Sequence, residues 1–267
     1  MKTRAITGLF FLIVMLASLL TGHYPFGAFY LLLALFCQYE FYGLIKKAGY
    51  FPNIYTGMFN GAFIYTVFAL LAFHRTSPAA MFLIPVPLSF IFILELYKKT
   101  STPFQNIAFT FLGLVFTIMP FTFFHAMAYM GTEFNFHIPL GFFVMLWSND
   151  TGAYLTGRAF GRMKLFERHS PKKTVEGFVG GVLISGLAGY ILSIYYPELH
   201  WSQWITMAVL ISCFGTLGDL VESMFKRSIN VKDSGGILPG HGGVLDRFDG
   251  LLIAAPIVYS YLYFVTN

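Results

Sequence analysis

The sequence predicts an all-α, polytopic membrane protein. Of its 267 residues, 57% are hydrophobic and only 11% are charged, and the mean hydropathy is +0.68. Apolar runs recur along the whole chain near the length of about 20 residues that carries a helix across a bilayer. A soluble domain needs more charge on its surface, so this composition excludes one. The net charge of +5 is explained by orientation in the membrane, and no nucleic-acid partner is expected.

Nine transmembrane helices account for these apolar runs. The first run, Ala5 to Leu20, has no small-x-small cleavage site and is followed by many more spans, so we interpret it as a retained helix rather than a signal peptide. Glycines at 157 and 161, and at 177, 180 and 181, favour close packing of the sixth and seventh spans. The predicted spans are 5–22, 26–43, 55–73, 80–97, 105–129, 138–160, 176–196, 202–221 and 250–266.

The distribution of Lys and Arg predicts the orientation of these helices. With the N-terminus in the cytoplasm, 16 of the 17 Lys and Arg residues fall at cytoplasmic helix ends, and only Arg75 falls on the other side. Cytoplasmic loops of membrane proteins carry this excess of positive charge. We therefore expect a multi-pass protein of the cell's inner (cytoplasmic) membrane, with a cytoplasmic N-terminus and an outside C-terminus. Two long loops, about 161–175 and 222–249, then face the cytoplasm.

Polar residues are distributed unequally between the two halves of the chain. We expect residues 1–137 to be a scaffold of transmembrane helices, for which a homodimer contact is left open. Residues 138–267 are expected to form the catalytic region. In the first half, Glu40 and Glu95 lie near cytoplasmic helix ends, where we expect their side chains to reach water.

An ionisable residue, Asp150, lies well inside the sixth span. Such a group is costly in a membrane unless it faces a wet cavity or a partner. Asp150, Tyr154 and Arg158 are spaced i, i+4 and i+8, so they lie on one stripe of the helix. The stripe indicates either a polar site or an internal Asp–Arg pair that stabilises packing.

Two short-spaced acidic groups flank the second cytoplasmic loop. Asp219 is followed on the same helix face by Glu222 and Ser223, and Asp246 precedes Asp249 by three residues. Carboxylates that converge repel each other unless a cation lies between them. Mg²⁺ is typically held by one or two carboxylates together with substrate phosphate. The alternative is a set of ordinary salt bridges to Lys226, Arg227 and Arg247.

Glycine and positive charge are concentrated in the same loop. Its five glycines, at 235, 236, 240, 242 and 243, allow backbone N–H groups to approach a phosphate closely. Lys226, Arg227, Lys232 and Arg247 add cations, so the loop is typical of a phosphate-plus-metal site, although glycines alone also suit a flexible connector. His241 fits a phosphate donor, a proton shuttle or a structural role.

The first cytoplasmic loop ends in a second basic stretch. Ser170 is expected to be the N-cap of the seventh span, with Pro171 at the first helical position. Lys172 and Lys173 either anchor the span to anionic lipid heads or bind nucleotide phosphates. The hydroxyls of Ser170 and Thr174 favour phosphate binding.

The residues from Ser223 to Asp249 resemble the signature of the phosphatidate cytidylyltransferases, which are the CDP-diacylglycerol synthases. The resemblance rests on SMFKR at 223–227, Lys232-Asp233, LPGHGG at 238–243 and DRFD at 246–249, at fixed spacing over about 27 residues. Other recurring stretches of the family are matched by NDTGAY at 149–154, Gly157-Arg158, SPKKT at 170–174 and Gly218-Asp219. The resemblance therefore covers residues 149–250, and the first half supports it only through hydropathy.

This resemblance implies that CTP and phosphatidate, a membrane lipid, react to give CDP-diacylglycerol and pyrophosphate. It implies a Mg²⁺ requirement, with K⁺ as a candidate second ion, and it makes Asp219, Asp246 and Asp249 the metal-facing carboxylates. The other residues expected to act in catalysis are Lys226, Arg227, Lys232, Asp233, His241 and Arg247. Those expected to bind substrate are Asp150, Tyr154, Arg158, Ser170, Lys172, Lys173, Thr174, Glu222 and Ser223.

Two other functions remain open from the sequence. A CTP-dependent polyprenol or phytol-type lipid kinase would share the nucleotide and metal site but release CDP instead of pyrophosphate. An ion-coupled transporter would use Asp150 and Asp219 within the membrane. Transporters generally contain internal repeats, and the sequence shows none.

Overall fold

The structure, a computed structural model, describes residues 2–131, 133–236 and 242–266. Its first half consists of α1 (Lys2–Leu20), α2 (His23–Lys47), α3 (Ile54–Ala72), η1 (Pro78–Leu83), α4 (Pro85–Leu96), α5 (Pro103–Gly113), the π-helical η2 (Leu114–Ile118), α6 (Met119–Ala126) and η3 (Met127–Tyr129). The second half consists of α7 (His137–Phe160), β1 (Lys164–Phe166), β2 (Ser170–Thr174), α8 (Val175–Tyr195), α9 (Trp201–Ser228) and α10 (Leu245–Thr266).

This element order confirms the predicted all-α, polytopic class. Within the described ranges, seven helical segments are long and apolar enough to cross a membrane: 23–47, 54–72, 78–96, 103–129, 175–195, 201–228 and 245–266. The apolar part of α1, Gly8–Leu20, is shorter, and α7 carries the polar run 148–151. The count of nine spans and the orientation of the termini therefore stay predictions.

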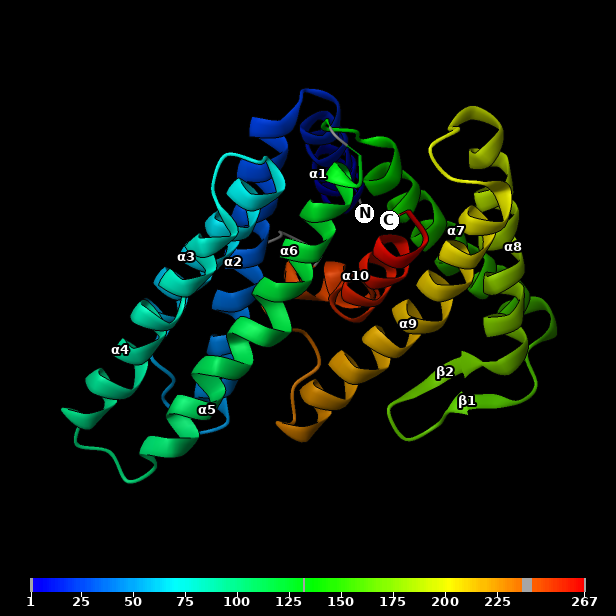
Figure 1. Ribbon diagram of the computed structural model, residues 1–267. Coiled ribbons are helices and arrows are strands. Elements are labelled where there is room, and N and C mark those ends of the chain that lie inside the picture. Colours follow the sequence, from blue (N-terminus) through cyan, green and yellow to red (C-terminus); the bar gives the residue numbers. More distant parts are fainter. Residues whose placement is uncertain (1, 132, 237–241, 267) are drawn as a thin grey trace.

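The helices form two groups that meet at α10. In Figure 1 the helices α2 to α5 lie on one side and α7 to α9 on the other, with α6 and α10 between them. Helix α10 packs against α9 of the second group, against α2 of the first, and against α6 beside it. The β1–β2 hairpin, the C-terminal end of α9 and the α4–α5 connection all lie at the lower end of the bundle in this view. The proposed division at residue 137 stays a prediction.

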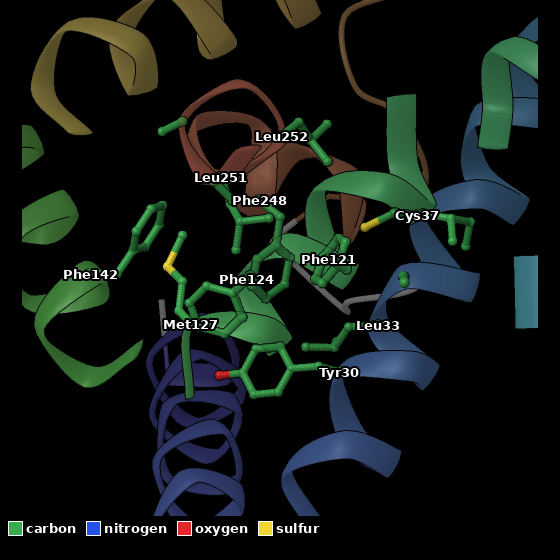
Figure 2. Close-up of a cluster of buried hydrophobic side chains, with 14 of the residues drawn as sticks. Tyr30, Leu33, Cys37, Phe121, Phe124, Met127, Phe142, Phe248, Leu251 and Leu252 are labelled. Carbon is green, nitrogen blue, oxygen red and sulfur yellow. The ribbon is translucent and has the colours of Figure 1, made fainter. Parts of the chain in front are cut away.

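An aromatic core holds the first turn of α10 in place. Phe248 lies in the buried cluster of Figure 2, with its ring centroid 5.3 Å from that of Phe121 on α6. Tyr30 and Leu33 of α2 belong to the same buried cluster. Because Phe248 is anchored there, the acidic residues on either side of it are held on the faces of α10 directed toward α9 and the preceding loop.

Glycines bring the helices of the second group into close contact, as the sequence predicted. A Cβ at Gly180 of α8 would lie 2.1 Å from Thr156 Oγ1 of α7, and one at Gly181 would lie 2.6 Å from Asn149 Oδ1. Between α9 and α10, a Cβ at Gly218 would lie 2.3 Å from the backbone oxygen of Asp249. The close approach of these helices therefore depends on residues without a side chain.

Gly218→Ala should separate α9 from α10, because the added methyl group meets backbone rather than a flexible side chain. We expect it to lower the free energy of unfolding by about 1–3 kcal/mol, which a lowered melting temperature in detergent would reveal. Gly186→Ala on α8 is the matched control, since a Cβ there has nothing within 4 Å. Equal melting temperatures for the two variants would contradict the packing argument.

The loop between α7 and α8 forms a hairpin that the sequence did not predict. Strands β1 and β2 are antiparallel, with Lys164 opposite Thr174 and Phe166 opposite Ser170. The expected N-cap at Ser170 is therefore wrong: residues 170–174 are extended by pairing with β1, and the cap is Thr174, whose Oγ1 accepts from the Gly177 N–H at 3.1 Å.

A carboxylate closes the base of this hairpin. Glu176, in the first turn of α8, accepts the backbone N–H groups of Arg162 at 3.0 Å and Met163 at 3.1 Å. At the strand end, Lys164 Nζ donates to the carbonyl of Pro171 at 2.7 Å. The hairpin is thus tied to the start of α8, which determines where its lysines lie.

Candidate active site

A cavity lies between α7, the hairpin, α8 and α9, with a volume of about 430 Å³. We call it the hairpin pocket. Backbone and apolar side chains such as Ala153, Leu165 and Phe178 form part of its wall. Seven of the residues that the sequence singled out also line it: Asp150, Tyr154, Arg158, Lys172, Lys173, Thr174 and Asp219.

The predicted stripe on the sixth span faces this pocket. Asp150, Tyr154 and Arg158 lie on consecutive turns of α7, and Arg158 Nη1 donates to the Tyr154 hydroxyl at 3.4 Å. Among the described residues, no ion pair joins Asp150 to Arg158, so the stripe does not form an internal Asp–Arg pair. Its charged groups are instead directed toward a space that a ligand could occupy.

One acidic cluster adjoins the pocket. Lys173 Nζ lies 2.5 Å from Asp219 Oδ2, and this ion pair connects the hairpin to α9. Asp249 of α10 lies within electrostatic range of Asp219, Asp150 and Lys173. The hydroxyl of Ser223 donates to Asp219 Oδ1 at 3.2 Å. Three carboxylates therefore lie within electrostatic range of Lys173, and only Asp219 forms an ion pair with it among the described residues.

A second acidic cluster lies one turn away. Lys226 Nζ is 2.5 Å from Glu222 Oε2 and 2.6 Å from Asp246 Oδ1. Asp246 Oδ2 also accepts the backbone N–H groups of Ser234 and Gly243, both at 3.0 Å. Glu222, predicted to bind substrate, is fully buried and does not line the hairpin pocket.

The two acidic pairs thus converge, as the sequence suggested. Helix α9 runs toward the loop and α10 runs away from it, so the two helices are antiparallel. Of each acidic pair, the residues farther from the loop, Asp219 and Asp249, therefore lie near each other. The residues closer to the loop, Glu222 and Asp246, also lie near each other. The three carboxylates assigned to metal are consequently divided between the clusters. Among the described residues no three Asp, Glu, His or Cys side chains already form a metal-ligand group.

Asp219 and Asp249 nevertheless suit a divalent cation. Mg²⁺ is held by one or two carboxylates plus substrate phosphates, and carboxylates brought together on neighbouring helices need a positive charge between them. Asp246 has its oxygens occupied by Lys226 and two backbone donors. Its metal assignment, like the others, stays a prediction.

The remaining predicted residues do not line the hairpin pocket. Arg227 is exposed and donates to the carbonyl of Val231 at 3.4 Å, and Lys232, Asp233 and Arg247 are also exposed. Ser170 lies at the start of β2, away from the cavity wall. His241 lies outside the described residues. The substrate roles of all these residues stay predictions.

The expectation that Glu40 and Glu95 reach water is wrong. Glu95 is buried, where it accepts from the Asn53 and Asn106 side-chain amides at 2.8 and 2.7 Å and pairs with Lys98 at 3.1 Å. Glu40 is 5% exposed and accepts from the Leu245 N–H at 2.9 Å and from the Ser234 hydroxyl at 3.2 Å. For Glu40 a usable signal was present, because an acidic residue in an apolar run with no cation one turn away requires a partner elsewhere.

Comparison with known proteins agrees with the sequence resemblance. Residues 2–265 match the model of the cytidylyltransferase family. Proteins named phosphatidate cytidylyltransferase are similar over nearly the full length: that of Staphylococcus haemolyticus is 36% identical, and those of Staphylococcus epidermidis and Staphylococcus aureus are 34% identical, with 97% of each chain covered in all three cases. The chain therefore belongs to the cytidylyltransferase family, as an enzyme built from membrane-spanning helices.

Proposed function

We propose that this enzyme transfers the cytidylyl group of CTP to phosphatidate, giving CDP-diacylglycerol and pyrophosphate for phospholipid biosynthesis. The observation that carries the proposal is the hairpin pocket, where Arg158, Lys172 and Lys173 adjoin the Asp219–Asp249 carboxylates. Cations for phosphate in the cavity, with Asp219 in its wall and Asp249 next to Asp219 for a metal, suit a nucleoside triphosphate. The names of the relatives support phosphatidate as the acceptor.

In the proposed reaction, an oxygen of the phosphatidate phosphate attacks the α-phosphorus of CTP. The new P–O bond forms as the bond from the α-phosphorus to the bridging oxygen breaks, and the electron pair leaves with pyrophosphate. A phosphate monoester has a second pKa of about 6, so phosphatidate is mostly dianionic at neutral pH and needs little help from a base. The chain must instead overcome the repulsion between two anions.

The basic residues of the pocket perform that task. Arg158 presents a planar fork that suits a phosphate oxygen pair, whereas Lys172 and Lys173 supply point charges. Arg158 is held on α7, and the two lysines are held on a hairpin tied to α8, so these cations are oriented before substrate arrives, which reduces the reorganisation needed at the moment of reaction. A cation held by Asp219 would free Lys173 from its ion pair, so that its ammonium group could contact phosphate.

We assign that cation to Mg²⁺, held by Asp219 and Asp249. Magnesium, when bound, would neutralise charge that develops on the leaving pyrophosphate. Asp150 would orient groups from the α7 wall of the pocket, and Asp246 would keep Lys226 in place in the neighbouring cluster. Whether K⁺ accompanies Mg²⁺, and whether Asp246 joins the ligands, stay predictions.

The two substrates reach the site from different directions in this proposal. Tyr154 lines the hairpin pocket and is 62% exposed, so the cavity edge lies at the outer surface of the bundle between α7 and the hairpin. Phosphatidate would enter there from the leaflet, and CTP would enter from the cytoplasm beneath the hairpin. This arrangement requires the lower end of Figure 1 to face the cytoplasm, in agreement with its basic residues.

The product formed from labelled CTP tests this function. Purified enzyme in detergent is incubated with phosphatidate and α-³²P-CTP, with and without Mg²⁺. We expect label in the lipid phase and pyrophosphate in the water phase, only when Mg²⁺ is present. Label that stays in water as CDP would indicate a lipid kinase instead, and CTP left intact with every condition would contradict the proposal.

A further inference from the structure

A carboxylate from the first half of the chain closes the loop that joins α9 to α10. We call residues 229–244 the signature loop. Glu40 of α2 accepts from the Ser234 hydroxyl near one end of the described loop and from the Leu245 N–H just past its other end. A second carboxylate, that of Asp246 on α10, accepts from the N–H groups of Ser234 and Gly243. The described ends of the loop are thus held between two carboxylates.

The fit around Glu40 leaves no spare room. A Cβ at Gly235 would lie 2.3 Å from Glu40 Oε1, and one at Gly243 would lie 2.4 Å from Oε2 and 1.9 Å from Ser234 Oγ. Glu40 cannot readily swing away, because α2 is packed against α10 through the cluster that contains Cys37 and Phe248 (Figure 2). These two glycines therefore provide the space for a carboxylate from another part of the fold.

The donors of the loop and the Glu40 carboxylate depend on each other. A buried carboxylate is strongly unfavourable unless it is hydrogen-bonded or paired, and no lysine or arginine pairs with Glu40 among the described residues. Its hydrogen bonds come from a hydroxyl and a backbone N–H of the loop region. Cys37, one turn earlier on α2, lies within electrostatic range of Glu40, Glu222 and Asp246 alike, which places Glu40 beside the Lys226 cluster.

From these contacts we infer that Glu40 is a positioning residue for cytidylyl transfer, a role that rests on the proposed function. By holding Ser234 and Leu245, Glu40 fixes the first turn of α10. It also fixes the loop ends that carry the two backbone donors of Asp246, which are the N–H groups of Ser234 and Gly243. Asp246 in turn holds Lys226. A side chain that contacts no substrate thereby sets the geometry of a charged pair in the cluster next to Asp219 and Asp249.

Glu40→Ala and Glu40→Gln separate positioning from charge. Glutamine keeps one oxygen for both donors, and its amide takes the place of Oε1, which has no hydrogen-bond partner. We expect Glu40→Ala to lower kcat by about 10–100-fold with little change in KM for CTP, and Glu40→Gln to retain most activity. Amide hydrogen exchange should rise in Glu40→Ala within peptides 230–236 and 242–248, but not in α7 or α8.

Glu95→Ala is the matched control, since Glu95 is an equally buried carboxylate that contacts Asn53 and Asn106 rather than the loop. A kcat loss in Glu95→Ala equal to that in Glu40→Ala, or unchanged exchange in the loop peptides of Glu40→Ala, would overturn the inference. Equal loss in Glu40→Gln and Glu40→Ala would also overturn it, because charge would then be the requirement.

A second variant and the activity of the wild type complete the experiment. If Glu40→Ala does not fold, Ser234→Ala replaces it: kcat should fall and amide exchange should rise in peptide 230–236, whereas Glu40→Gln should keep both near the wild type. Unchanged kcat and unchanged exchange in Ser234→Ala would count against the hydrogen bond to Glu40. If the wild type makes no CDP-diacylglycerol, the proposed function fails, whereas hydrogen exchange still decides whether Glu40 holds the loop.

Discussion

Asp219→Asn is expected to lower kcat for CDP-diacylglycerol formation by about a thousandfold, equivalent to about 4 kcal/mol of transition-state stabilisation. Asparagine has nearly the same size and can still accept the hydrogen bond from Ser223. It removes the negative charge that holds Lys173 and, in the proposed site, Mg²⁺. Initial rates at saturating substrates over a Mg²⁺ titration measure the effect, and the apparent affinity for Mg²⁺ should weaken together with kcat.

The control for Asp219→Asn is Glu167→Gln, which removes an exposed carboxylate from the turn between β1 and β2. Its rate should stay within about twofold of the wild type. An Asp219→Asn enzyme that melts like the wild type and keeps its rate and Mg²⁺ dependence would exclude Asp219 as a ligand. Loss of rate with unchanged Mg²⁺ dependence would instead assign Asp219 to the orientation of Lys173 alone.

Asp246→Asn should also lower kcat by about a thousandfold, for a different reason. The two oxygens of Asp246 serve Lys226 on one side and the N–H groups of Ser234 and Gly243 on the other. Asparagine has one oxygen, so its amide N–H₂ must face either a lysine or two backbone donors. The variant should still fold, because Phe248 keeps the start of α10 in the aromatic core.

A double-mutant cycle distinguishes this explanation from a general loss of activity. Lys226→Met removes the partner of Asp246, so the double variant should be little slower than the slower single variant. Independent, multiplying losses would show that the two residues do not act as a pair. A well-folded Asp246→Asn enzyme with normal turnover would remove Asp246 from the site altogether.

Hydropathy was sufficient to locate helices that end with their apolar run, but not a helix that continues into charged residues. The predicted span 176–196 corresponds to α8, Val175–Tyr195, and 55–73 corresponds to α3, Ile54–Ala72. In contrast, α9 continues to Ser228, beyond the predicted end at 221. Its last turns contain Glu222 and Lys226, whose charges are compensated by each other and by Asp246. Hydropathy along the chain does not predict these ion pairs, because Asp246 lies on another helix.

The same limit applies to the site. The stripe of Asp150, Tyr154 and Arg158 lies on one helix, so its periodicity was sufficient to predict a common face. Contacts between elements were not predictable in this way. The pairing of Lys173 with Asp219 depends on a hairpin whose strands are three and five residues long and carry no regular apolar alternation. The burial of Glu40 depends on a loop about two hundred positions later in the chain.

That separation has a consequence for biosynthesis in the membrane. Glu40 and the Leu245 N–H that it accepts are 205 residues apart. At a synthesis rate of about 5–20 residues per second, α2 leaves the ribosome roughly 10–40 s before its partner exists. During that interval the nascent helix carries an acidic side chain without its final donors, so it must be solvated at the membrane surface or shielded by the insertion machinery. Final docking of α2 is therefore completed only when α10 arrives.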